Sequence, residues 1–368
     1  MRVRLGEVAK ESRETLRGSK RGLPVVGLEH LEPGELSLTV WDADSENTFS
    51  KTFRKGQMLF GRRRAYLKKA AIAPFDGICS GDITVIEAST DRLMPELLPF
   101  IIQNDAFFTY AVGKSAGSLS PRAKWEHLQN FEFDLPPLAE QQKLAELLWA
   151  ANATREAYKK LLTKTDELVK SQFVEMFGDP VTNSKGLSVA PLGELCSIYR
   201  GGSPRPINEY LGGTIPWIKI GDATSGDDIY LHSTKDFIIE EGMAKSRFVK
   251  SGSLIFANCG VSLGFARIIT FDGCIHDGWL SLESIDELIN KEFLLKSLNH
   301  CTEYFRATAP DGTQPNLNTG IMKAFLQVIP PLDIQNRFAD FVRAAGKSKF
   351  VALEATKALN IQRMLKSI

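Results

Sequence analysis

The chain repeats itself once, and this repeat constrains the fold more than any other feature of the sequence. Four ordered segments of the first half return in the second half at offsets of 187, 196, 196 and 194: LGEV at 5–8, GQMLF at 56–60, FDG at 75–77, and PPL at 136–138 with Gln141 after it. Their counterparts are LGEL at 192–195, GSLIF at 252–256, FDG at 271–273, and PPL at 330–332 with Gln335 after it. Because four matches in the same order are hard to obtain by chance, we interpret the chain as a tandem duplication.

Each copy is predicted to contain a mixed α+β domain followed by a long helix. Short β-rich runs such as residues 81–86 and 253–256 alternate with helical stretches near residues 95–110 and 291–306. The Pro-Pro pair then ends a strand and can pre-set the first turn of a helix. We therefore expect four parts, which are two domains at residues 1–137 and 181–331 and two helices at residues 138–180 and 332–368.

The two helices carry the spacing of a coiled-coil seam. Core-type positions recur at alternating intervals of four and three from Leu144 to Met176, and less regularly from Ile334 to Leu359. About 40 helical residues extend roughly 60 Å, which is longer than a small domain is wide. The alternative is an amphipathic helix lying on its own domain. We favour a fold in which the two helices pair as an antiparallel coiled coil between two globular ends.

Composition excludes several classes of protein. Of the 368 residues, 43% are hydrophobic and 24% charged, which is typical of soluble globular proteins, and the formal net charge is only +1. No apolar run approaches the roughly 20 residues of a membrane helix, and the N-terminus is too charged for a signal peptide, so we expect a cytoplasmic protein. The five cysteines are scattered and form no Cys-x-x-Cys pair, which argues against a zinc site or a disulfide framework.

The sequence lacks the motifs of common active sites. The GKS segments at 113–115 and 346–348 resemble the tail of a phosphate-binding loop, but Phe108 and Phe341 stand where the upstream glycines should be. The DLPP segment at 134–137 resembles an adenine methyltransferase motif, but Leu138 stands where an aromatic ring should stack on a flipped base. The histidines are single, without a second ligand at helical or strand spacing. We therefore expect binding, with no catalytic residue, metal site or cofactor on this chain.

A basic stretch in the first copy is the main candidate for a nucleic-acid surface. Residues 51–69 hold eight basic residues and no acidic one. Arginine side chains suit phosphate oxygens and the paired acceptors of guanine. The alternative is a solvated strand edge guarded by charge. The candidate DNA-binding residues here are Arg62, Arg63, Arg64, Tyr66, Lys68 and Lys69, joined by Ser120, Arg122 and Lys124 from a second polar turn.

The second copy offers polar loops of different chemistry. Residues 200–206 form a Gly-Gly-Ser-Pro turn, and residues 311–318 carry amides of the kind that read adenine edges. As turns alone these loops would be unremarkable. The candidates are Arg200, Ser203, Arg205, Lys219, Gln314 and Asn316.

The order of these features resembles the DNA-specificity subunit of type I restriction-modification enzymes. The matching features span nearly the whole chain: the Leu-Gly-Glu starts, the Gly-Gly-Ser-Pro segment followed by Pro-Trp-Ile at 216–218, the Gly-x-Leu-Ile-Phe strand, the Pro-Pro-Leu-x-x-Gln helix entries, and FVEMFGDP at 173–180. The first copy has no Gly-Gly-Ser-Pro counterpart, because residues 11–17 occupy that place.

The resemblance implies a non-catalytic subunit with two target-recognition domains, each reading one half of a split site in double-stranded DNA. It implies that the helices set the spacing and dock two modification subunits and restriction subunits. S-adenosylmethionine, ATP and Mg would then be held by those partners. A duplicated protein-interaction adaptor without a role on DNA is the alternative, and an enzyme of unrecognised type is a third possibility.

Overall fold

The protein forms two compact units in a computed structural model that describes residues 1–368 except 45, 90, 225, 261, 311–315 and 360–368. The first unit comprises residues 1–158 with 355–368, and the second comprises residues 159–354. The border between them falls inside the first long helix.

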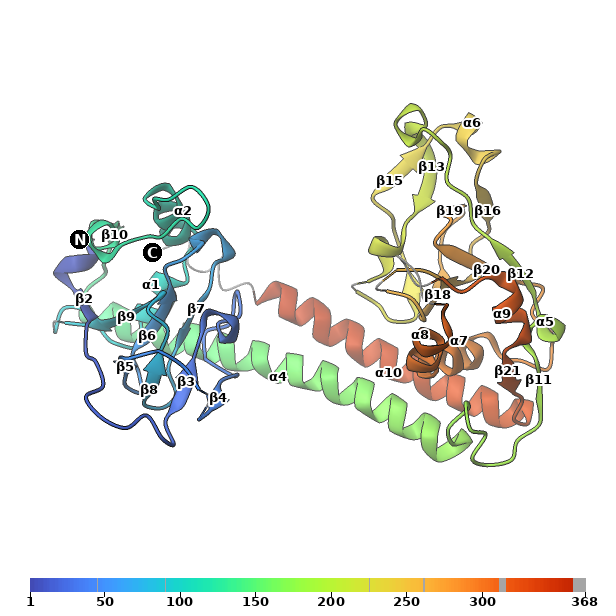
Figure 1. Ribbon diagram of the computed structural model, residues 1–368, viewed down its shortest axis with the longest axis horizontal. Coiled ribbons are helices and arrows are strands. Elements are labelled where there is room, and N and C mark those ends of the chain that lie inside the picture. Colours follow the sequence, from blue (N-terminus) through green and yellow to red (C-terminus); the bar gives the residue numbers. More distant parts are fainter. Residues whose placement is uncertain (45, 90, 225, 261, 311–315, 360–368) are drawn as a thin grey trace. The chain divides into compact units, whose positions relative to one another are not determined.

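The first unit contains two small sheets, one antiparallel and one mixed, and a two-stranded ribbon (Figure 1). The first sheet, in the order β2-β9-β6-β7, is antiparallel and is formed by β2 (Ala9–Ser12), β6 (Met58–Gly61), β7 (Ala70–Ile72) and β9 (Ile83–Ala88). The second sheet, in the order β4-β3-β8-β5, is formed by β3 (Pro24–Val26), β4 (Asp42–Ala43), β5 (Lys51–Phe53) and β8 (Gly77–Cys79). The ribbon joins β1 (Arg2–Arg4) to β10 (Glu132–Asp134), and the helices are α1 (Leu98–Ile102), α2 (Asp105–Gly113) and α3 (Trp125–Leu128).

The second unit repeats this topology strand for strand. Its first sheet runs β12-β20-β17-β18 and adds β14, and its second sheet runs β15-β13-β19-β16. These strands are β12 (Ser197–Arg200), β13 (Leu211–Ile218), β14 (Tyr230–Leu231), β15 (Asp236–Ile238), β16 (Arg247–Val249), β17 (Leu254–Ala257), β18 (Ala266–Ile269), β19 (Gly273–Ile275) and β20 (Trp279–Glu283). The ribbon pairs β11 (Val189–Pro191) with β21 (Leu326–Val328), and the short helices are α5 (Leu192–Leu195), α6 (Glu240–Met243), α7 (Lys291–His300), α8 (Thr302–Thr308) and α9 (Thr319–Ala324). The tandem duplication is confirmed.

Two of the predicted helices are each divided in two. The stretch 95–110 divides into α1 and α2 because the Asn104 side chain accepts a hydrogen bond from Ala106 N at 2.8 Å and starts a new helix. The buried Gln103 between them donates to the carbonyl of Glu35 at 2.8 Å. The stretch 291–306 divides in the same place, at Cys301, into α7 and α8.

A buried glutamine fastens each long helix to its own domain. The helices are α4 (Leu138–Phe177) and α10 (Leu332–Ala358). Gln141 donates from Nε2 to the carbonyls of Arg92 and Pro136 at 2.7 and 2.8 Å, and accepts from Met94 N at 2.9 Å. Gln335 makes the same three bonds in the second unit, to Leu288 O, Pro330 O and Asn290 N. The repeated Pro-Pro-Leu-x-x-Gln segment is therefore a joint between domain and helix.

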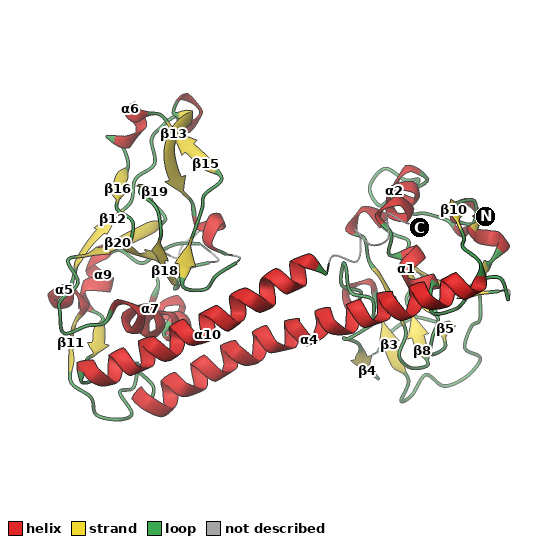
Figure 2. Ribbon diagram, turned by 180° about the vertical axis from the view of Figure 1, so that it is seen from behind, coloured by secondary structure: helices red, strands yellow, loops and turns green. Residues whose placement is uncertain are grey.

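In the second unit the end of α4 packs antiparallel on α10, and Figures 1 and 2 both show the two helices side by side there. The rings of Phe173 and Phe177 lie 5.5 and 5.3 Å from the ring of Phe338, and Lys349 pairs with Asp166 at 2.6 Å nearer the other end. The predicted antiparallel pairing is confirmed within this unit. Helix α4 ends where Gly178 takes a φ of +73°, a conformation that glycine adopts without strain. The predicted C-terminal helix extends to Ala358, and residues 360–368 lie outside the described part of the chain.

A candidate nucleic-acid interface

Three loops of the first unit meet at a place that we call the first junction, defined by residues 61–64, 80–82 and 116–123. Arg62 N donates to Asp82 O at 3.0 Å, and Ala123 N donates to Arg62 O at 2.9 Å. Arg63 and Arg122 face each other in an isolated antiparallel bridge. The structure thus brings the two predicted basic clusters of the first copy together on one backbone frame.

Asp82 holds two arginine side chains at the first junction. Its Oδ1 accepts from Arg122 Nε at 2.8 Å, and its Oδ2 lies 3.4 Å from Arg63 Nη1. Arg63 also donates from Nη2 to Ser120 Oγ at 3.1 Å. Burial by itself would raise the pKa of Asp82, but the hydrogen bonds and charges of Arg122 and Arg63 outweigh it and lower the pKa below its usual range.

The other candidates in the first copy have different surroundings. Arg64 is exposed, takes a φ of +53°, and donates its backbone N–H to Pro121 O. Tyr66 is exposed, Lys68 pairs with Asp105 at 2.5 Å, and Lys69 donates to Leu28 O at 2.7 Å. Lys124 is exposed at the residue before α3.

Acidic residues from outside the stretch 51–69 partly neutralise it. Lys51 lies 3.4 Å from Glu11, and Arg54 lies 2.9 Å from Glu14. With Asp82 and Asp105, these contacts pair four of the eight cations counted in the sequence. The exposed positive charge is therefore smaller than the stretch alone suggests, and it is concentrated near the first junction.

The second unit builds the same backbone frame, which we call the second junction, from residues 257–260, 276–278 and 316–318. Asn258 N donates to Gly278 O at 3.0 Å, and Leu317 N donates to Asn258 O at 2.8 Å. Cys259 and Asn316 form an isolated antiparallel β-bridge. These bonds match the first junction one for one. Arg62, Arg63, Asp82 and Arg122 of the first junction correspond to Asn258, Cys259, Gly278 and Asn316 of the second.

The second junction is made of amides where the first is made of charges. Asn258 is fully buried and donates from Nδ2 to Asn316 Oδ1 at 3.0 Å and to Leu317 O at 3.1 Å. Asn316 is half-buried. Gln314, predicted beside it, lies outside the described residues.

The Gly-Gly-Ser-Pro turn lies against the second junction through Asp277. Arg200 Nε donates to Asp277 O at 3.0 Å, Ser203 Oγ donates to Asp277 Oδ1 at 2.7 Å, and Arg205 lies 3.8 Å from the carboxylate. A Cβ on Gly201 would lie 2.2 Å from the carbonyl oxygen of His276, so the turn requires glycine there. Three of the predicted residues therefore converge on Asp277, Arg200 on its backbone carbonyl and Ser203 and Arg205 on its carboxylate.

His276 and Lys219 complete this cluster. The Nδ1 atom of His276 accepts from Gly278 N at 2.9 Å, and its Nε2 lies 2.9 Å from Asp277. Burial lowers the pKa of His276, so the ring is neutral at pH 7. Lys219 pairs with Asp236 and lies 5.5 Å from the ring centre of Trp217.

Sequence reasoning missed Asp82, Asp277 and Asn258. An isolated aspartate or asparagine in a turn carries no pattern of its own. One signal was available, because Asp82 directly precedes β9 and Asn258 directly follows β17, and these strands belong to the equivalent pairs β6/β9 and β17/β20 of the two copies. Aligning the two copies around those strands would have pointed to both residues.

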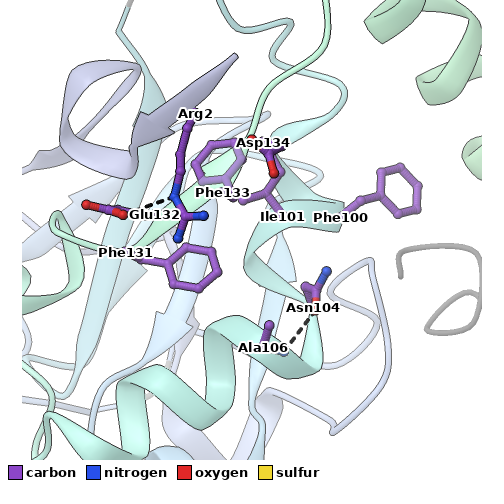
Figure 3. A pocket seen from close by; sticks show the side chains of 9 residues that line it. All are labelled: Arg2, Phe100, Ile101, Asn104, Ala106, Phe131, Glu132, Phe133 and Asp134. Carbon is purple, nitrogen blue, oxygen red and sulfur yellow. Dashed lines mark hydrogen bonds and ion pairs between the residues drawn. The ribbon is translucent and has the colours of Figure 1, made fainter. Parts of the chain in front are cut away.

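A shallow hollow of about 210 Å³ in the first unit lies elsewhere, between β10 and the helices α1 and α2 (Figure 3). Its rim carries the ion pair of Arg2 with Glu132 at 3.1 Å, beside the rings of Phe131 and Phe133. None of the predicted DNA-binding residues lines it. Within the described ranges, no three His, Cys, Asp or Glu side chains are placed to hold a metal ion. No described helix is both long and apolar enough to cross a membrane.

Comparison with known proteins identifies the class of this duplicated fold. Residues 185–363 match the family model "Type I restriction modification DNA specificity domain". Two similar structures cover nearly the whole chain: the type I restriction-modification S subunit from M. genitalium (TM-score 0.62, 14% identity, 99% of this chain and 94% of that chain), and a chain from a study of complex assembly and conformational transition of the type I R-M system (0.57, 20%, 100% and 96%). At these identities the likeness concerns the fold.

Two relatives agree in sequence with parts of the chain. The type I restriction enzyme EcoDI specificity subunit of Escherichia coli is 27% identical over 143 residues, which are 38% of this chain and 32% of that protein. The MjaIX specificity subunit of Methanocaldococcus jannaschii is 25% identical over 276 residues, which are 69% of this chain and 62% of that protein. The chain thus spans less than two thirds of the length of either relative. Over these parts the chain is similar to type I restriction-modification specificity subunits.

Proposed function

We propose that this chain is the non-catalytic DNA-recognition subunit of a type I restriction-modification complex. The first and second junctions each bind one half of a bipartite site in double-stranded DNA. One observation carries this proposal: the same backbone frame occurs twice in one chain and carries different side chains each time. Two readers of different sequences need a constant scaffold with variable loops.

The charges support DNA as the ligand. Arg64 and Arg122 have exposed side chains at the first junction, with the exposed Lys124 next to it, and the exposed Arg200 and Arg205 lie beside the second junction. Cationic side chains of this kind position a protein on phosphates, and arginine and asparagine read base edges in the major groove. A protein-interaction adaptor would have no need of two such polar, arginine-bearing junctions.

The long helices supply the spacer and the partner surface in this proposal. Two modification subunits dock on α4 and α10, and restriction subunits join them. S-adenosylmethionine would bind to the modification subunits, and ATP with Mg to the restriction subunits, so this chain needs none of them. Co-purification with a separately expressed adenine methyltransferase subunit, retained in high salt, tests this part.

Selection of bound duplexes from a random pool tests the recognition itself. We expect a split consensus of two short blocks separated by a fixed number of unspecified base pairs. Binding should weaken steeply with salt, since contacts to phosphates release counterions. A pool that yields no consensus at any salt concentration would refute DNA recognition and leave the adaptor hypothesis.

Shortening α4 tests the spacer. Deleting four residues from its middle removes about 6 Å of helix and turns the seam by about 40°. The accepted gap between the blocks should then change by about two base pairs, at 3.4 Å per step. Substituting the same four residues with alanine is the matched control, and it should leave the gap unchanged. An identical gap after the deletion would defeat the spacer role.

A further inference from the structure

We propose that Arg122 reads a guanine in the first half-site and that Asp82 is the positioning residue that aims it. This inference rests on the proposed function and makes it specific to one side chain and one base. The Arg122 guanidinium group has two edges that can donate paired hydrogen bonds.

Asp82 occupies only one edge of that group. Its carboxylate accepts a hydrogen bond from Nε at 2.8 Å and a longer one from Nη2 at 3.5 Å. Among the described residues, no hydrogen bond or ion pair engages Nη1 of Arg122. The free edge, with Nη1 and the second hydrogen of Nη2, has the spacing of guanine O6 and N7. Because the side chain is 45% exposed, this edge is accessible to a base.

The neighbouring arginines lack this combination of restraint and exposure. Both terminal nitrogens of Arg63 are engaged, by Asp82 and by Ser120. The Nε atom of Arg62 is buried without a hydrogen-bond partner in the described part of the chain, so its side chain points partly into the protein. Arg63 and Ser120 therefore stabilise the loop, and Arg122 is the arginine that is placed to contact a base.

A carboxylate at a DNA-facing surface must have a compensating role. Its charge repels phosphates, so it weakens general affinity for DNA. The Asp82 side chain is only 18% exposed and its lowered pKa keeps it ionised, which makes it a fixed partner for the two arginines. A held arginine loses less rotamer freedom when it meets its base, because it is already in place.

The second unit cannot contain the same device. Gly278 stands at the place of Asp82, and a Cβ there would lie 2.7 Å from Ile220 Cδ1 and 3.0 Å from His276 Nδ1. At the place of Arg122 it carries Asn316, which is fixed by Asn258. At these two equivalent positions, an arginine held by an aspartate is thus found in the first junction and not in the second.

The test is an Asp82→Asn variant of the full chain, with affinities measured on the selected duplex and on a scrambled duplex over a range of salt. We expect the specific affinity to fall by about 10-fold to 100-fold, the effect of a lost bidentate base contact. The affinity for the scrambled duplex should stay the same or rise, because a repelling charge is gone. Repeating the selection should show one guanine preference lost, in the first block only.

Two further variants separate positioning from folding. Arg122→Lys should lose the same guanine preference while keeping its charge, and Asp82→Glu should restore part of the discrimination. Asp105→Asn is the matched control, because Asp105 pairs with the exposed Lys68 outside the junction. It should raise affinity for both duplexes alike and leave the consensus unchanged.

The outcomes are distinct from those for the proposed function. If the wild-type chain selects no consensus, the proposed function itself fails. If the wild-type chain selects one, and both Asp82→Asn and Arg122→Lys keep every base preference, the assignment of Arg122 and Asp82 is overturned. If Asp82→Asn does not fold, Arg122→Lys alone decides, since its side chain is exposed.

Discussion

The first and second junctions share a backbone and differ in almost every side chain that matters. Arg62, Asp82 and Arg122 stand in one where Asn258, Gly278 and Asn316 stand in the other, although the hydrogen bonds that join the loops are the same. The first junction is a carboxylate between arginines, and the second is a pair of coupled amides. The backbone hydrogen bonds of this fold can therefore stay the same while the side chains at the candidate DNA-binding positions change.

The joints behind the junctions follow the opposite rule. Gln141 and Gln335 make the same three hydrogen bonds in the two units. Arg155 on α4 likewise forms an ion pair with Glu35, and Lys349 on α10 forms one with Asp228. Glu35 and Asp228 occupy similar places, because the residues after them, Leu36 and Ile229, accept equivalent backbone hydrogen bonds in the two domains. Parts that hold the frame are repeated, and parts that face the ligand are not.

Removing the glutamine joint should have the largest effect, and should be the same in both units. Gln141→Ala and Gln335→Ala each remove one hydrogen-bond partner from two carbonyls and one N–H that are buried or part-buried, which costs about 3 kcal/mol of unfolding free energy. Urea denaturation of the two variants measures this. Gln142→Ala is the control, because the Gln142 side chain is exposed and its hydrogen bond among the described residues is to Glu146. A loss confined to one unit would break the equivalence of the two joints.

Adding one methyl group should distinguish the two turns that face the junctions. Gly201→Ala places a Cβ 2.2 Å from a backbone carbonyl, and relieving that overlap should cost about 1–3 kcal/mol. Gly81→Ala in the first junction meets nothing within 4 Å, and its effect should be near zero. The measurement is the urea midpoint of each variant. Equal losses would mean that the Gly-Gly turn has no special constraint.

The salt dependence of DNA binding should separate the charged junction from the amide junction. Arg64→Ala and Lys124→Ala should each reduce the slope of log K against log salt by about 0.9, as expected for one lost phosphate contact. Asn316→Ala should leave that slope unchanged and lose a base preference in the second block. Identical slopes in all three variants would remove Arg64 and Lys124 from the phosphate contacts.

The smallest expected effect is the pH dependence of the Asp82 contacts. Because the folded protein lowers the pKa of Asp82, its stabilisation is fully present above the unfolded value, about 3.9, and is lost as the pH falls through the folded value. The unfolding free energies of wild type and Asp82→Asn should differ by about 1 kcal/mol or less at pH 7, since the pair is partly exposed. The difference should disappear near pH 2. A difference that grows on acidification would contradict the assignment.

Much of the architecture could be predicted, because it is written in local patterns. The repeat, the strand runs and the long helices all depend on residue spacing and on turn chemistry close in sequence. The break at Asn104 was missed because it depends on one side-chain cap and on the buried Gln103, which bonds to a residue far away in the chain. The candidate residues were found by type, but their roles were not, since each role depends on a partner from another loop.

The sequence by itself determined that two sibling domains and two seam-bearing helices exist, because periodicity and repetition are properties of the order of residues. Only the tertiary structure decided which charges remain available. Lys51, Arg54, Arg63 and Lys68 count equally in a sum, but each meets an acid from a distant segment, and Coulomb attraction acts over distances in space and not along the chain. For the same reason no sequence pattern indicated a role for Asp82. Asp82 is the centre of the first junction because folding places Arg63 and Arg122 beside it.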